Sequence, residues 1–346
     1  MTDRIDLKSL RYDEIENLCK ENGLPRFRAK QIFSWISRGV TSFDEMTDLS
    51  KDIRALLSEK CYLSDFKIAK KLVSALDGTV KYLIELTDGQ HIECVVMDYH
   101  HGLSLCMSTQ VGCAMGCAFC ASTKNGLVRN LTAGEMLDEF VFISKDLGKR
   151  LSTIVLMGIG EPLHNFDNLT RFLDNINNEK GVNLSHRHIT VSTCGIVPKI
   201  YELADRKYQI NLALSLHAAT DEKRKAIMPI AKRYSLKELT DACVYYENAT
   251  GRRITFEYTL IAGVNDKKSD ADDIVKLLSP LKNRHVNLIS VNPIDDSGRF
   301  SKVASGAIDK FASYLKEKNV NATVRRSMGS DISGSCGQLR NEQEGK

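Results

Sequence analysis

The sequence predicts an α/β protein, in which a partial (β/α)6 TIM-like barrel follows a small α+β domain. Three changes of pattern along the chain support this prediction. Residues 8–60 show a helical spacing of apolar residues, residues 66–97 alternate as strands do, and after residue 103 short β-branched runs alternate with longer amphipathic segments. A hydrophobic content of 42% over 346 residues is enough to bury a large core.

The N-terminal part contains three expected helices. Residues 12–23 and 26–39 carry apolar residues three and four positions apart and stop at Gly23 and Gly39, and residues 50–60 form another amphipathic segment. Glycine commonly ends a helix because it adopts the left-handed conformation without strain.

Strand alternation follows over residues 66–97 and is interrupted twice by an Asp-Gly pair, at 77–78 and at 88–89. Asp-Gly pairs favour two-residue hairpin turns. We therefore expect residues 1–97 to form an accessory domain of helices followed by β-hairpins.

The barrel is expected within residues 98–340. Its strand candidates are "LSLCMST", "STIVLMGIG", "HITVSTCG", "INLALSLHA", "RITFEYTLIAG" and "HVNLISVNP". Amphipathic segments separate them, and "NATVRRSM" can add an edge strand. The polar tail, residues 341–346, is expected to be disordered. In barrel enzymes the chemistry lies at the C-terminal ends of the strands, so those ends hold the candidate site.

Composition excludes several classes of protein. The sequence contains no run of eighteen apolar residues, so we expect no membrane span. The charged N-terminus has no apolar signal-peptide core, which predicts a cytoplasmic protein with reduced thiols. The ten cysteines are then better explained by metal binding or thiol chemistry than by disulfides. A net charge of +4 permits a nucleic-acid partner without requiring one.

A cluster of thiols, "CAMGCAFC", directly follows the first expected barrel strand and contains Cys113, Cys117 and Cys120. Structural zinc is the simpler alternative, but it usually needs four ligands arranged as paired cysteines. Three thiolates on a [4Fe-4S] cluster leave one iron open to another ligand. The spacing resembles that of the radical S-adenosylmethionine (SAM) superfamily, and the resemblance implies a [4Fe-4S] cluster whose open iron binds SAM.

Small and polar residues end the later strands. Taken singly, these endings are common in strand-terminal turns. The resemblance implies that Gly160 and Glu161 meet the amino group of SAM, and that the other strand ends complete its site. The candidate cofactor contacts are Gly160, Glu161, Ser192, Ser215, Leu216, His217 and Asn292.

Two further cysteines narrow the choice of enzyme. Cys106 lies within the first barrel strand, and Cys336 lies in the Gly/Ser-rich segment "DISGSCGQL", which predicts an exposed, mobile loop with a reactive thiol. With "RFRAKQIFSWI", "CMSTQVGCAMGCAFCAST", "LMGIGEPLHN", "VSTCGIVP" and "VRRSMGSDISGSCGQL", the chain resembles the RlmN/Cfr family of radical-SAM RNA methyltransferases almost end to end.

The resemblance implies a mechanism that consumes two SAM molecules per turnover. Cys336 would accept a methyl group from one SAM, and a radical made from the second would remove a hydrogen from that S-methyl group. The methylene radical would add to an adenine carbon, and Cys106 would release the product by forming a disulfide with Cys336. Glu93 would accept the proton; without the resemblance, it reads as a solvent-facing strand carboxylate.

The implied substrates are RNAs. By resemblance, the enzyme methylates C2 of an adenosine in the peptidyl-transferase centre of 23S rRNA and of an adenosine beside the anticodon in some tRNAs. Residues 1–97 would contact the RNA, a flavodoxin or ferredoxin would reduce the cluster, and the protein would be a monomer. Scattered basic segments, "KRK" and "VRRS" among them, could contact phosphates or simply be solvated. The alternatives are C8 methylation, a radical-SAM enzyme with a small-molecule substrate, and a zinc-binding RNA module.

Overall fold

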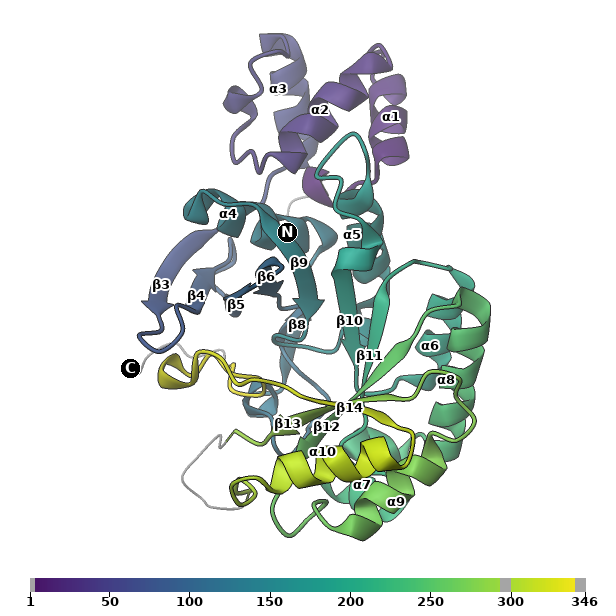
Figure 1. Cartoon of the computed structure of the whole chain (residues 1–346). Coiled ribbons are helices and arrows are strands. Elements are labelled where there is room, and N and C mark those ends of the chain that lie inside the picture. The colour runs from purple at the N-terminus through teal and green to yellow at the C-terminus, as the bar shows by residue number, and fades with distance from the viewer. Residues whose placement is uncertain (1–3, 293–299, 340–346) are drawn as a thin grey trace.

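The protein is described by a computed structural model that covers residues 4–292 and 300–339. One sheet with the order β14-β13-β12-β11-β10-β9-β6-β5-β4-β3 runs through it (Figure 1). Its strands are β3 (Lys67–Val73), β4 (Val80–Glu85), β5 (His91–Tyr99), β6 (Gly102–Cys106), β9 (Leu151–Leu156), β10 (Ile189–Thr193), β11 (Asn211–Ser215), β12 (Ile254–Leu260), β13 (His285–Ser290) and β14 (Asn321–Val324).

In this sheet, β6 and the strands from β9 to β14 pair in parallel and form the predicted partial barrel. β14 is the expected edge strand. Helices lie on the outside of this curved sheet, so one buried layer of apolar side chains fills the space between them (Figure 1). These helices are α4 (Ala133–Leu147), α5 (Phe166–Asn177), α6 (Val197–Asp205), α7 (Asp221–Ile227), α8 (Leu236–Thr250), α9 (Lys268–Leu277) and α10 (Ala307–Glu317).

The N-terminal helices are confirmed as α1 (Tyr12–Glu21), α2 (Phe27–Ser37) and α3 (Lys51–Lys60), and they lie at the top of the molecule in Figure 1. Gly23 and Gly39 both have a φ of 66°, the left-handed conformation expected just after a helix. A buried ion pair between Lys8 and Asp138, with 2.7 Å between Nζ and Oδ2, ties this end of the chain to α4.

The hairpin strands of the accessory domain extend the barrel sheet. β5 pairs antiparallel with β6, so the expected boundary between residues 97 and 98 falls inside β5. The expected disordered tail, residues 341–346, lies outside the described residues. Within the described ranges, no helix is both long and apolar enough to cross a bilayer.

The prediction of two-residue hairpin turns was wrong in length. Residues 74–79 connect β3 to β4, and residues 86–90 connect β4 to β5. Side chains stabilise the longer turns: Ser74 Oγ accepts from the Leu76 backbone N–H at 3.1 Å, and Asp88 Oδ1 accepts from that of Gln90 at 3.1 Å. These side-chain bonds add to the backbone hydrogen bonds that close both turns.

Candidate active site

A short hairpin fixes the loop that carries the cysteine cluster. β7 (Gln110–Gly112) pairs with β8 (Leu127–Asn130), so residues 113–126 close back on themselves at the C-terminal end of β6. Gly112 has a φ of 75°, and a Cβ there would lie 2.0 Å from the backbone oxygen of Gly126. Only glycine fits at this crossing, so Gly112 determines how the loop closes.

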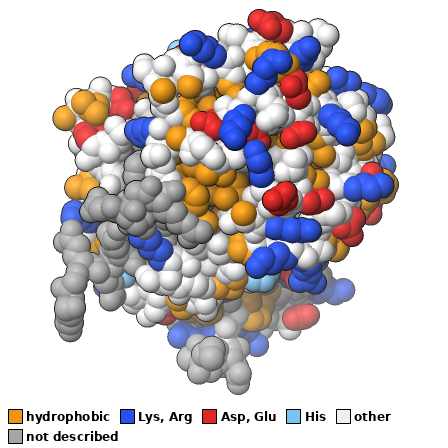
Figure 2. Space-filling view, turned by 90° about the horizontal axis from the view of Figure 1, so that it is seen from below, with side chains coloured by type: hydrophobic (Ala, Val, Ile, Leu, Met, Phe, Trp, Pro, Cys, Tyr) orange, Lys and Arg blue, Asp and Glu red, His pale blue; other side chains and the backbone are white. Residues whose placement is uncertain are grey.

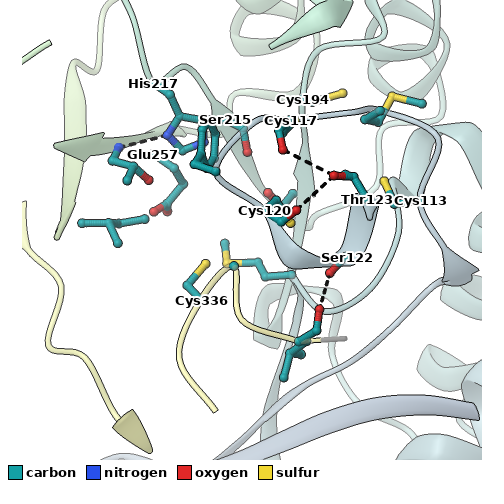
Figure 3. A pocket seen from close by; sticks show the side chains of 18 of the residues that line it. Cys113, Cys117, Cys120, Ser122, Thr123, Cys194, Ser215, His217, Glu257 and Cys336 are labelled. Carbon is teal, nitrogen blue, oxygen red and sulfur yellow. Dashed lines mark hydrogen bonds between the residues drawn. The ribbon is translucent and has the colours of Figure 1, made fainter. Parts of the chain in front are cut away.

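Cys113, Cys117 and Cys120 border one pocket of about 140 Å³ at the barrel mouth (Figure 3). Burial, together with the neighbouring thiols, raises the pKa of Cys113 to about 12 and also raises that of Cys117. Thiolates at such positions need a bound cation to stay ionised. The three thiols therefore suit a metal centre.

The arrangement fits an iron–sulfur cluster better than zinc. No three His, Cys, Asp or Glu side chains in the described ranges are arranged to hold a single metal ion. A [4Fe-4S] cluster needs no such convergence, because each thiolate binds a different iron. Cys113, Cys117 and Cys120 border one pocket without converging on a single point, as ligands of three different irons would. A single zinc ion would need ligands that converge on it.

Most of the predicted cofactor contacts also border this pocket. They are Gly160, Glu161, Ser192, Ser215, His217 and Asn292. Leu216 differs, because its side chain is 1% exposed and packs in the main core. Leu216 follows the last residue of β11 and points into the core, and the chain then turns at His217, which has a left-handed φ of 52°.

Close backbone approaches shape the end of β9. A Cβ at Gly158 would lie 2.5 Å from the Met107 backbone oxygen, and one at Gly160 would lie 2.7 Å from Cβ of Gln110. The glycines of "MGIGEP" therefore allow β9 to end against the β6–β7 connection. Glu161 follows, and its carboxylate accepts from the Cys194 backbone N–H at 2.7 Å, while burial raises its pKa.

His217 is held as a neutral ring. Its Nδ1 accepts from the Thr259 backbone N–H at 2.9 Å, which leaves Nε2 as the protonated nitrogen (Figure 3). Burial, with a smaller contribution from Arg224, lowers the pKa of His217 to about 3. The ring packs edge-on against Phe119, with 4.7 Å between centroids. His217 thus offers a hydrogen-bond donor without a charge.

Arg224 is a buried residue beside the site. The basic segment "KRK" predicts surface cations that contact phosphates or water, but Arg224 is 0% exposed. Its guanidinium donates to the backbone oxygens of Cys194 at 2.7 Å, Ser215 at 3.1 Å and Leu216 at 3.1 Å. Arg224 therefore joins the ends of β10 and β11, where the polar pocket residues lie.

Cys106 and Cys336 border a second, adjoining pocket. Cys106 is buried at the end of β6, and burial, with Cys336 as the next cause, raises its pKa to about 12. Cys336 is exposed, as expected, and it also borders the pocket of the cluster cysteines (Figure 3). Both thiols are free in this structure. Cys336 thus borders both pockets.

The backbone around Cys336 is anchored rather than loose. The Ala121 N–H donates to the Gly337 oxygen at 2.8 Å, and Ser122 Oγ donates to the Leu339 oxygen at 2.8 Å. Asn292 Nδ2 donates to the oxygen of Cys336 itself at 3.1 Å. These bonds hold the C-terminal segment against the loop that carries the cluster cysteines.

Glu93 is buried, so the interpretation as a solvent-facing carboxylate was wrong. Its side chain is 7% exposed, and Oε1 lies 2.8 Å from Nζ of Lys81. Along β5 it shares a face with Val95 and Met97, which pack with Cys106. Cys94 lies on the opposite face in the main core, as its position in the strand predicts.

Two charged residues of the pocket that holds Cys113, Cys117 and Cys120 were missed at the sequence level, Glu257 and Arg325. Glu257 is a buried residue of β12 whose Oε2 accepts from Nδ2 of Asn287 at 3.0 Å. Arg325 follows β14, borders both pockets, and faces Cys336 and Glu257. The motif "VRRS" had suggested a surface cation. The available signal was its position directly after a parallel strand, where a side chain can face the barrel mouth.

The chain was also compared with known proteins. Residues 107–278 match the radical SAM superfamily, and residues 5–63 match the ribosomal RNA large subunit methyltransferase N-terminal domain. A protein of Alkaliphilus oremlandii named "Probable dual-specificity RNA methyltransferase RlmN" is 55% identical over 98% of both chains. One of the same name from Clostridium perfringens is 54% identical over 95% of this chain and 94% of its own. The chain belongs to the RlmN family.

A solved structure shares the fold of this chain. A radical SAM methyltransferase from Sphaerobacter thermophilus matches with a TM-score of 0.91 and 42% identity, over 98% of this chain and all of the other. The predicted barrel and the predicted family are both confirmed. As a radical SAM protein, this RlmN-family member uses a [4Fe-4S] cluster and SAM.

Proposed function

We propose that the protein methylates C2 of an adenosine in the peptidyl-transferase centre of 23S rRNA and of an adenosine beside the anticodon in some tRNAs. The observation that carries this proposal is the position of Cys336. It borders the pocket of the cluster cysteines and also the pocket of Cys106. A radical-SAM enzyme that acts directly on a small molecule has no use for two additional thiols placed in this way. Relatives that match the whole chain are named as RNA methyltransferases.

In this proposal Cys113, Cys117 and Cys120 hold the [4Fe-4S] cluster. A cluster held by these thiols would supply one electron for the cleavage of SAM to methionine and a 5′-deoxyadenosyl radical. The residues proposed to contact SAM are Gly160, Glu161, Ser192, Ser215, His217 and Asn292, with Leu216 limited to its backbone. His217 would donate from Nε2, while Glu161 and the serine hydroxyls would accept.

The chemistry on RNA is assigned to three residues. The sulfur of Cys336 takes the methyl group of one SAM, which leaves as S-adenosylhomocysteine. A 5′-deoxyadenosyl radical takes a hydrogen atom from this S-methyl group, and the resulting S-methylene carbon bonds to the adenine ring. The adduct then loses one electron, which the oxidised cluster would accept, and its ring proton, which Glu93 accepts. The Cys106 thiolate attacks the sulfur of Cys336 and forms a disulfide, while the electron pair of the broken sulfur–carbon bond stays with the transferred carbon, which takes up a proton to become the methyl group.

A large polar cavity supports a nucleotide substrate. It has a volume of about 420 Å³ and shares Met157, Glu257 and Arg325 with the pocket of the cluster cysteines. Polar side chains from several barrel strands line it, and Arg187 and Arg253 are exposed at its edge. Because most of this lining comes from the N-terminal halves of the barrel strands, opposite the ends that carry the thiols, we assign it to RNA contacts away from the reacting base.

The described residues on the face of the molecule seen from below carry no uniform positive charge that would attract RNA (Figure 2). Viewed from below, hydrophobic side chains gather near the middle of the face, and basic and acidic side chains are mixed around them (Figure 2). A mixed surface of this kind predicts modest nonspecific attraction for RNA. We therefore propose that recognition depends on the shape of the folded RNA, with residues 1–97 as a second contact.

Mass spectrometry of the peptide that contains Cys336 is the first test. Protein purified without oxygen and holding iron should carry a methyl group on Cys336. The variant Cys336→Ala should still produce 5′-deoxyadenosine from SAM but should leave the RNA unmethylated. If Cys336 stays unmodified in protein that cleaves SAM, the small-molecule alternative is favoured instead.

Nucleoside analysis of the RNA product decides between the two adenine carbons. We expect 2-methyladenosine in a 23S rRNA fragment and in tRNA, and 8-methyladenosine would indicate the C8 alternative. The flavodoxin or ferredoxin donor, the monomeric state and the cytoplasmic location stay predictions. Reduction of the cluster by purified flavodoxin and ferredoxin, compared side by side, tests the first of them.

A further inference from the structure

We infer that Lys81 is a positioning residue that joins Glu93 to the segment carrying Cys336, an inference that rests on the function proposed above. Nζ of Lys81 lies 2.8 Å from Oε1 of Glu93 and donates to the backbone oxygen of Ser333 at 3.2 Å. Lys81 is 8% exposed, so this cation sits in a largely dry environment. Its two contacts link β5 to a segment more than two hundred residues away.

The sheet places Lys81 for this role. On the paired strands β4 and β5, Lys81 lies opposite Val95, and Glu93 is two positions further along the same face. A diagonal pair of this kind is within reach of a long side chain. Val95 in turn lies opposite Cys106 on β6. Lys81, Glu93 and Cys106 therefore belong to one face of three adjacent strands.

The turn before Lys81 holds the same C-terminal segment. Ser74 Oγ donates to Asp331 Oδ1 at 2.7 Å, the Ala75 N–H donates to Asp331 Oδ2 at 2.9 Å, and the Gly329 N–H donates to Asp77 Oδ2 at 3.0 Å. Together with Lys81, the β3–β4 turn thus contacts residues 329–333 at several points. Beyond Cys336, the segment is held by the loop of the cluster cysteines.

The contact of Lys81 with Ser333 lies at a conformationally unusual residue. Ser333 has a φ of 50°, in the left-handed region that non-glycine residues rarely adopt. Gly334 follows it, and Gly337, with a φ of 81°, lies just after Cys336. A backbone of this type keeps one conformation only where neighbouring groups hold it. Lys81 supplies one such hold through the Ser333 oxygen.

The position of Lys81 predicts at which stage it acts. Methyl transfer from SAM to Cys336 needs the cofactor pocket, which Lys81 does not border. Release of the product needs Glu93, Cys106 and Cys336 around one base at the same time. Lys81 contacts Glu93 and also the segment that carries Cys336. Loss of Lys81 should therefore slow the transfer to RNA more than the loading of Cys336.

The test separates the two stages in one preparation. Lys81→Met, Lys81→Arg and a control, Lys71→Met, are purified with their clusters intact. Lys71 lies on the same hairpin as Lys81 but pairs with Asp146 of α4. Methylation of Cys336 is measured by mass spectrometry before RNA is added. RNA methylation and the covalent adduct of Cys336 with RNA are then measured in a single turnover on a 23S rRNA fragment.

We expect Lys81→Met to load Cys336 as the wild type does but to methylate RNA on the order of 10- to 100-fold more slowly, the usual effect of misplaced catalytic groups. The adduct should accumulate, and Lys81→Arg, which keeps the cation, should restore most of the rate. Lys71→Met should match the wild type. Lys81→Gln, which keeps a polar side chain, replaces Lys81→Met if thermal unfolding shows that the latter is not folded.

Two results would overturn the role of Lys81. One is RNA methylation by Lys81→Met at the wild-type rate. The other is an equal loss of Cys336 loading and of RNA methylation, which would mean a general structural role. Failure of the proposed function looks different, because the wild-type protein itself would then carry no methyl group on Cys336.

Discussion

Replacing Arg224 tests whether one buried cation holds the strand ends together. Arg224 lies on α7 with no exposed surface and donates three hydrogen bonds to the backbone oxygens of Cys194, Ser215 and Leu216. Arg224→Met keeps a long apolar stem and removes every donor. Three buried carbonyl groups would then lose the donor that Arg224 supplies.

The expected magnitude follows from these bonds. Each hydrogen bond from a charged donor contributes about 1.5–3 kcal/mol, so three contribute roughly 4–9 kcal/mol. Part of this is offset, because burial of Arg224 is itself costly, as its lowered pKa shows, and its Nη1 has no partner among the described residues. We expect Arg224→Met to lose about 3–5 kcal/mol of unfolding free energy, as when one partner of a buried polar group is removed.

Thermal unfolding of the anaerobic protein, followed by far-ultraviolet circular dichroism, measures this loss. At roughly 2 °C per kcal/mol in a large domain, the midpoint should fall by about 6–10 °C. Lys225→Met, an exposed neighbour on the same helix, is the matched control and should change little. If both variants unfold at the same temperature, the three hydrogen bonds do not stabilise the strand ends and the reasoning fails.

Three further predictions concern the cluster site and its surroundings. Cys117→Ala should lose bound iron while keeping its circular dichroism spectrum, and full iron content by elemental analysis would contradict the assignment of this thiol. Glu139 is fully buried, its Oε2 has no hydrogen-bond partner among the described residues, and burial raises its pKa above the ordinary 4.5. The unfolded state therefore ionises first as pH rises, and the fold loses stability above about pH 4.5. In urea unfolding between pH 5 and 8, the unfolding free energy of Glu139→Gln should fall less with rising pH than that of the wild type. If the two free energies fall equally with pH, the burial argument is refuted. His217, with a pKa of about 3, should stay neutral from pH 5 to 8. A ring that titrates near pH 6.5 by nuclear magnetic resonance would show that it is not enclosed.

Residue spacing along the chain was sufficient to find the candidate cofactor site. Cys113, Cys117 and Cys120 lie within eight residues, so any fold that closes the loop brings them close together. The resemblance to radical-SAM proteins pointed to Glu161 and His217, and the rule that parallel strands end at the same edge placed both beside the cysteine loop. Local pattern also predicted the N-terminal helices and their glycine stops.

Long polar side chains could not be placed from the sequence in the same way. Arg224 and Arg325 resemble surface charges in their local context, and Glu93 resembles an exposed strand residue. Their burial depends on partners from distant segments, such as the Cys194 and Ser215 carbonyls for Arg224 and Lys81 for Glu93. A charged group can be buried only where such partners are supplied, and local sequence does not record them.

The amino-acid sequence by itself thus determined the barrel, the accessory helices, the resemblance to the family and the closeness of Cys113, Cys117 and Cys120, because each depends on neighbours in the chain or on a repeating pattern. Only the tertiary structure decided that Cys336 borders two pockets and that the β3–β4 turn is hydrogen-bonded to residues 329–333. It also decided that Lys81 connects these residues to Glu93. The physical reason is that these contacts join residues far apart in the chain, and they exist only once the sheet has brought its strands and the C-terminal segment together.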